Sequence, residues 1–165
     1  MRYLPFVLAL ATAALAADPP DQAKRGKELF ALKSSTGVAC STCHQLDGQG
    51  TAIGPDLKQI GQLHPRAIVT AILATRTQYV QEVTLPTGRP FPAIKSGAAY
   101  FDLSKTPPAE MTTTASGFKS VKDNATWKHP PESRGLTKDQ LADVIAYIRF
   151  ATSGDTKGVD PKDIL

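Results

Sequence analysis

The only two cysteines of the chain lie three positions apart, in the stretch Cys40-Ser41-Thr42-Cys43-His44. A CxxC pair can form a redox-active disulfide, contribute thiolates to a zinc site, or attach haem through thioether bonds. A thiol–disulfide enzyme places the motif at a helix start after a strand, whereas here a helical pattern and Gly37 precede it. A zinc site needs about four ligands, and no further histidine lies at the spacing of a zinc module. The histidine directly after the second cysteine favours covalent haem attachment, because it can reach the iron.

The first residues predict an exported protein. Arg2 precedes an apolar run from Leu4 to Leu15, and the small residues Ala14-Leu15-Ala16 precede a polar stretch with prolines. This order is typical of a cleaved secretory signal, and the apolar run is short for a membrane span. We expect a signal peptide over residues 1–16, a periplasmic mature protein and no membrane span after cleavage; a retained anchor is the alternative. Export agrees with haem attachment, which takes place on the outer side of the bacterial membrane.

Apolar residues at helical spacing predict three helices. They run from Asp21 to about Ser34, from Pro65 to about Arg76, and from a capping box of Thr137 and Gln140 to just before Gly154. The glycine-rich stretch 40–60 predicts a loop after one short helical turn.

The segment from about 78 to 126 has a different character. It contains the strand-like stretches YVQEVTL and AAYFDL, a β-branched run after Met111, and five prolines. We predict two to four short strands inserted into an otherwise helical domain. The polar residues 155–165 predict a flexible tail.

Three parts of the sequence together resemble the single-haem c-type cytochromes of the helical kind: the CxxCH motif, GPDL at 54–57, and LTKDQLADVIAYIRF at 136–150. The resemblance implies a mainly α, cytochrome c-like domain over residues 17–154 around one covalently bound haem c, with a small inserted β segment. Cys40 and Cys43 would attach the haem, and His44 would bind its iron. The resemblance further implies that the first and last helices meet at Gly26, Phe30 and Tyr147, and that the carbonyl of Pro55 orients His44. The insertion is similar to that of a longer subgroup, found joined to periplasmic dehydrogenases or as free carriers.

The sixth iron ligand has two candidates. The family usually supplies a methionine shortly before the last helix, but Met111 lies within the strand-like segment, which favours a place in the core. His129 lies eight positions before Thr137, where the family's loop crosses the distal side of the haem, and Trp127 beside it would pack on the porphyrin edge. We therefore expect His129 as the second axial ligand, with Met111 as the alternative. His64 directly precedes a predicted helix, which favours capping over binding iron.

These features predict a carrier of single electrons between redox partner proteins, rather than an enzyme. The alternative is a haem enzyme or gas sensor with an open or weakly ligated iron. The full sequence has a formal net charge of +4, which becomes +3 when the expected signal with Arg2 is removed. This mildly basic charge indicates an acidic docking surface on the partner, and the spread of basic residues excludes a nucleic-acid interface. A weakly basic docking face could be formed by the lysines at 24, 27, 33, 58 and 122.

Overall fold

The protein is described by a computed structural model, which places residues 18–32, 39–73, 79–112, 117–124, 126–127, 129 and 135–164. The expected signal peptide and the predicted helix ends at Ser34 and Arg76 lie outside these residues. All three predicted helices are present: α1 (Asp21–Ala31), α2 (Pro65–Ile72) and α3 (Lys138–Ser153). Single 3₁₀ turns lie at η1 (Cys40–Thr42), η2 (Ile60–Gln62) and η5 (Pro161–Asp163).

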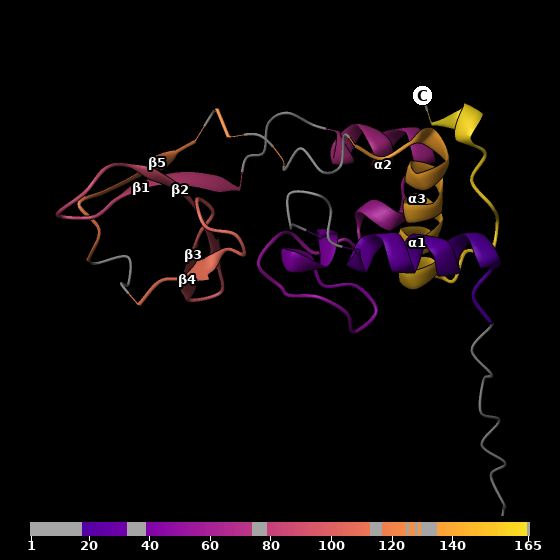
Figure 1. The fold of residues 1–165 in the computed structure, drawn as a ribbon, viewed down its shortest axis with the longest axis horizontal. Helices are drawn as coiled ribbons and strands as arrows, with labels where there is room; N and C mark the ends of the chain where they lie inside the picture. The colour runs from indigo at the N-terminus through magenta and orange to yellow at the C-terminus, as the bar shows by residue number, and fades with distance from the viewer. Residues whose placement is uncertain are drawn as a thin grey trace, which may run out of the picture.

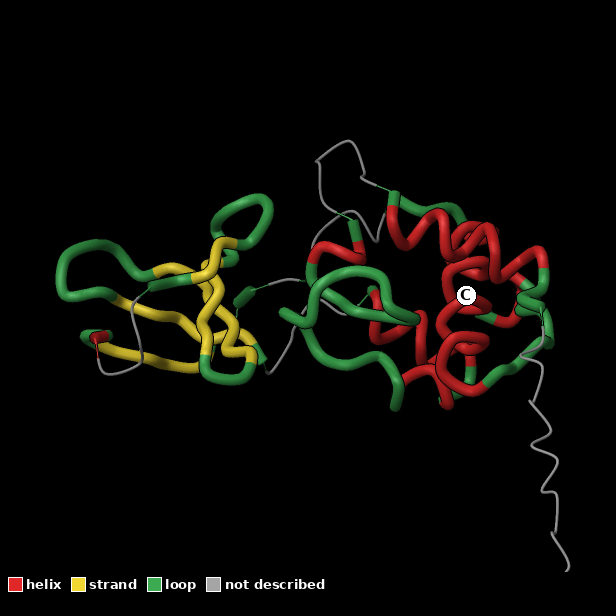
Figure 2. Tube along the Cα trace, turned by 90° about the horizontal axis from the view of Figure 1, so that it is seen from below, coloured by secondary structure: helices red, strands yellow, loops and turns green. Residues whose placement is uncertain are grey.

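The helices and strands occupy separate parts of the molecule (Figure 1). The described residues of 18–73 and 135–164 contain α1, α2 and α3 and form a helical lobe, whereas those of 79–124 contain the strands and form a β-lobe beside it. The view from below shows the same separation, with the strands on one side and the helices on the other (Figure 2). The predicted helical domain is present, and the inserted β segment is a lobe of its own.

The helical lobe is organised around the crossing of α1 and α3. Gly26 allows the close approach, because a Cβ atom there would lie 1.9 Å from the backbone oxygen of Asp143. Beside it, the rings of Phe30 and Tyr147 meet edge to face with centroids 5.6 Å apart. The predicted contact between Gly26, Phe30 and Tyr147 is therefore present.

An ion pair fixes the same crossing. Arg25 on α1 donates two hydrogen bonds of 2.9 Å each to the carboxylate of Asp143, which is only 7% exposed. The bidentate pairing satisfies a carboxylate that the packing of α3 would otherwise leave without a partner. It also raises the pKa of Arg25 through the hydrogen bond and the charge of Asp143.

Helix α3 is the central element of this lobe. Its N-terminus is closed by the predicted capping box of Thr137 and Gln140, and Gly154 ends it with a φ of 68°. Every residue from Leu141 to Ile148 is buried, so the helix is covered on nearly all sides. Gly61 of η2 packs against it so closely that a Cβ would meet the side chain of Thr152 at 2.0 Å.

The C-terminal residues pack on this core, which corrects the flexible tail predicted for 155–165. Val159 and Ile164 are 4% and 3% exposed and belong to the same apolar core as α1 and α3. The Gln22 side chain donates to the carbonyl of Val159 at 2.9 Å and accepts from its amide at 2.8 Å. Two apolar residues among the polar ones therefore suffice to hold this segment, and the helical lobe extends to Ile164.

The β-lobe is one antiparallel sheet with strand order β4-β3-β2-β1-β5. Its strands are β1 (Val80–Thr84), β2 (Phe91–Ser96), β3 (Ala99–Asp102), β4 (Ala109–Glu110) and β5 (Ser120–Asp123). Val83, Ala93 and Tyr100 form a small core of their own, against which Phe91, Met111 and Phe118 pack.

The described chain thus has five strands rather than two to four. Strand β2 was missed because prolines at 90 and 92 argue against a central strand. Pro92 nevertheless lies opposite Glu82 near the start of β2, and its carbonyl accepts a hydrogen bond of 2.9 Å from the amide of Leu103. A proline lacks only the amide donor, so its carbonyl still pairs with the neighbouring chain.

We predict that Ile164→Ala lowers the free energy of unfolding by about 2 kcal/mol, because it removes a buried side chain from the core. Denaturant unfolding followed by circular dichroism measures this change. The matched control is Lys162→Ala in the same segment, where the side chain is exposed. Equal stability of the two variants would contradict the packed position of Ile164.

Candidate functional site

The CxxCH motif folds as a single tight turn. The 3₁₀ turn η1 holds Cys40 to Thr42, and the amide of His44 donates to the carbonyl of Cys40 at 2.9 Å. Before the turn, the hydroxyl of Thr42 accepts a hydrogen bond of 3.1 Å from the amide of Ala39. Both cysteines are half-buried thiols, and burial raises the pKa of Cys43 with a smaller contribution from Cys40. The motif therefore presents two half-buried sulfur groups from one tight turn.

The loop after the motif folds back onto it. The amide of Ile53 donates to the carbonyl of Cys43 at 3.1 Å, and the amide of Thr51 donates to that of Ser41 at 3.0 Å. Gly50, with a φ of 86°, lies so close that a Cβ would meet the carbonyl oxygen of His44 at 2.2 Å. The hydroxyl of Tyr147 reaches the carbonyl of Leu46 at 3.3 Å, so α3 also holds this loop.

His44 is oriented by the GPDL segment. Its Nδ1 lies 2.9 Å from the carbonyl oxygen of Pro55, and a Cβ on Gly54 would approach its ring atom Cε1 to 2.8 Å. Burial lowers the pKa of His44, and the hydrogen bond to Pro55 only partly offsets this effect. A neutral imidazole that donates through Nδ1 keeps the lone pair of Nε2 for a metal ion. Pro55 thus lies where the resemblance implied.

His129 lies opposite His44. The centroids of the two imidazole rings are 6.2 Å apart, and the ring planes are inclined by 24°. One iron that bound a nitrogen of each ring at about 2 Å would place the two centroids about 6 Å apart. The separation would therefore allow one iron between the two rings, and the half-buried thiols beside His44 would be placed to attach its porphyrin.

Two other candidates for the iron lie elsewhere. Met111 packs in the apolar core of the β-lobe, and its amide donates to the carbonyl of Tyr100 at 2.8 Å. His64 caps α2, where its Nδ1 accepts a hydrogen bond of 3.3 Å from the amide of Arg66. The capping predicted for His64 is confirmed.

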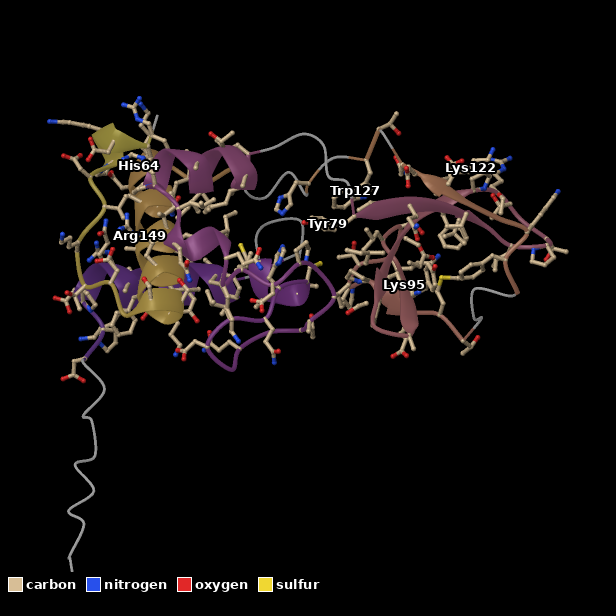
Figure 3. The ribbon with its side chains drawn as sticks, turned by 180° about the vertical axis from the view of Figure 1, so that it is seen from behind. His64, Tyr79, Lys95, Lys122, Trp127 and Arg149 are labelled. Carbon is tan, nitrogen blue, oxygen red and sulfur yellow. The ribbon has the colours of Figure 1, made fainter. Side chains whose placement is uncertain are left out.

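Trp127 and Tyr79 lie at the end of the β-lobe that faces the helical lobe (Figure 3). Trp127 is half-buried, whereas Tyr79, directly before β1, is 52% exposed. Close by, the hydroxyl of Ser96 on β2 donates to the carbonyl of Ala52 in the loop after the motif, so the lobes are in direct contact.

Comparison with known proteins agrees with this geometry. The chain matches the Cytochrome c family over residues 23–151, a range that includes the motif, His129 and most of α3. The protein belongs to the cytochrome c family. It therefore binds haem c covalently, and Cys40 and Cys43 lie in a CxxCH sequence of the kind to which this haem is attached. Haem-based electron transfer is the general activity of the family. No curated protein matches the chain.

Two further properties concern the alternatives of a zinc site and a membrane anchor. Within the described residues, no group of three or more His, Cys, Asp or Glu side chains is arranged to hold a bare metal ion. The zinc alternative therefore has no ligand set in this part of the cytochrome. None of the helices in the described ranges has the length and apolar character needed to cross a membrane.

We predict that Gly54→Ala disturbs the orientation of His44, because the new Cβ would meet both the ring and the carbonyl of Cys43. Electron paramagnetic resonance of the ferric protein should show shifted g values, and the free energy of unfolding should fall by about 1–3 kcal/mol. The control is Gly48→Ala in the same loop, where a Cβ would have no atom within 4 Å. That variant carries backbone strain, since Gly48 has a φ of 72°, but it should keep the spectrum. An unchanged spectrum of Gly54→Ala would contradict the role given to Gly54.

Proposed function

We propose that this cytochrome is a periplasmic carrier that passes single electrons between redox partner proteins, with His44 and His129 as the axial ligands of one haem iron. The separation of 6.2 Å between the two imidazole rings carries this proposal. Bound haem supplies an iron that changes valence, and the protein residues orient it and set its ligands. A second histidine gives a lower reduction potential than the more common methionine.

The arrangement of the site supports a carrier rather than an enzyme or gas sensor. An enzyme or sensor needs an open or weakly ligated iron, whereas a second axial histidine, the role proposed for His129, would close it. Met111, the alternative ligand, packs in the apolar core of the β-lobe. Periplasmic location is inferred from the order of charged, apolar and small residues over positions 1–16.

The partner is proposed to be a redox protein with an acidic docking surface, on the basis of the net charge of +4, or +3 without the expected signal. The described lysines considered for this contact lie in both lobes. Lys24 and Lys27 lie on α1 and pair with Asp21 and Asp47 at 3.3 and 3.1 Å. Lys122 lies on the β-lobe (Figure 3), and position 33 is outside the described residues. The proposal of an acidic partner therefore rests on the net charge.

We predict that His129→Ala leaves the sixth coordination position of the haem iron open. The reduced variant should bind carbon monoxide stoichiometrically within seconds, whereas the reduced wild type should bind it at least about a hundredfold more slowly, because His129 occupies the site. Stopped-flow absorption spectroscopy measures both rates. Met111→Ala is the control and should behave as the wild type. Rapid binding to Met111→Ala with slow binding to His129→Ala would transfer the ligand role to Met111.

We predict that the purified protein exchanges one electron with mediators. A potentiometric titration followed at the haem absorption bands should give a slope of about 59 mV per tenfold change in the ratio of oxidised to reduced protein. His129→Met should raise the midpoint potential, because a thioether favours the reduced iron. Sustained consumption of peroxide or oxygen by the wild-type protein alone would instead indicate an enzyme with an open iron.

A further inference from the structure

We propose that Asn124 is a positioning residue for the distal ligand: its side chain ties the segment that carries His129 to the edge of the sheet. The inference deepens the proposed function and depends on His129 as the ligand. We call the described residues Thr126, Trp127 and His129 the return segment, because they follow β5 and precede the helical lobe in the chain.

The side chain of Asn124 accepts three hydrogen bonds from the return segment. Its Oδ1 accepts from the amide of Thr126 at 3.0 Å, from the hydroxyl of Thr126 at 3.1 Å, and from the amide of Trp127 at 2.8 Å. This is an Asx turn, in which a side-chain oxygen replaces a backbone carbonyl as the acceptor of the turn. The direction of the chain through Thr126 and Trp127 therefore depends on one oxygen atom.

The backbone of Asn124 is in turn fixed to the sheet. Its amide donates to the carbonyl of Val80 at 3.0 Å, directly beyond the last β1–β5 pair, Gln81 with Asp123. Val80 is 2% exposed, so the acceptor lies in a packed part of the β-lobe. Asn124 thus joins a rigid element on one side to the return segment on the other.

His129 follows Trp127 by two positions, so the Asx turn restricts the position of the His129 backbone and thereby that of the distal imidazole. Two residues span at most about 7 Å, which leaves little freedom to compensate for a displaced Trp127. The proximal ligand His44 belongs to the helical lobe, whereas His129 is attached through Asn124 to the β-lobe. The strength of distal ligation is therefore set by the β-lobe through this turn.

The β-lobe contains a matched control. Asp102, at the end of β3, accepts through Oδ1 from the amide of Ser104 at 2.8 Å and from its hydroxyl at 2.6 Å. This second Asx turn has the same pattern of an amide and a hydroxyl donor two positions on, with a carboxylate as the acceptor, but it does not lead to His129. Asp102→Ala therefore removes a comparable turn from the same sheet without touching the return segment.

The experiment compares Asn124→Ala, Asn124→Asp and Asp102→Ala as full-length holoproteins. Carbon monoxide binding to the reduced form, measured by stopped flow, reports how often His129 leaves the iron. We expect Asn124→Ala to bind carbon monoxide at least about tenfold faster than the wild type, since lost hydrogen bonds raise the population of the open form. Its ferric spectrum should gain a high-spin signal in electron paramagnetic resonance. Asn124→Asp keeps the acceptor and should restore the rate to within about twofold of the wild type, as should Asp102→Ala.

Each contrary outcome has a distinct meaning. If His129→Ala binds carbon monoxide no faster than the wild type, the ligand assignment fails and the inference fails with it. If His129→Ala opens the iron but Asn124→Ala does not, the positioning role of Asn124 is wrong and the ligand assignment remains. Equal opening by Asp102→Ala, or no rescue by Asn124→Asp, would also overturn the proposal, because loosening of the whole lobe would then explain the effect. Thermal unfolding by circular dichroism verifies that each variant is folded.

Discussion

The structure depends on the close crossing of α1 and α3. A side chain larger than hydrogen at position 26 would collide with the backbone of Asp143, and the crossing brings Phe30 against Tyr147. Tyr147 then extends the effect, because its hydroxyl holds the loop that folds over the CxxCH turn. Burial raises the pKa of this hydroxyl to about 12, so it remains a neutral hydrogen-bonding group at physiological pH. Tyr147 therefore connects the contact between α1 and α3 to the loop that covers the CxxCH turn.

The two histidines proposed as iron ligands come from different lobes and are held in different ways. Pro55 and Gly54 restrict the imidazole of His44 by a hydrogen bond and by direct contact. His129 follows a turn that Asn124 joins to the sheet. The lobes also meet where Ser96 donates to the carbonyl of Ala52. An iron bound by both histidines would add a further link between the lobes, and the insertion thereby acquires a physical role in ligation.

The sequence predicted well the elements that depend on local chemistry. The helix pattern, the capping box at Thr137, and the contact of Gly26 with the last helix each follow from residue type and spacing, and the structure contains them. It predicted poorly the elements that depend on packing between distant segments. Strand β2 was not predicted because the prolines near it lower its strand propensity, and propensity does not include the pairing with β1 that stabilises it. The packed C-terminal segment was not predicted because only two apolar residues of a polar segment, Val159 and Ile164, join the core.

The sequence by itself determined the chemistry of the cofactor, because thiols three positions apart with an adjacent histidine suit covalent haem attachment on one turn. It also marked His129 as a candidate by its distance from the last helix. Only the tertiary structure decided that the His129 ring lies across from His44 and that Met111 packs in the core of the β-lobe. His129 and Met111 follow His44 by 85 and 67 positions in the chain. Their distances depend on how the β-lobe pairs its strands and meets the helical lobe, and no local pattern encodes that arrangement.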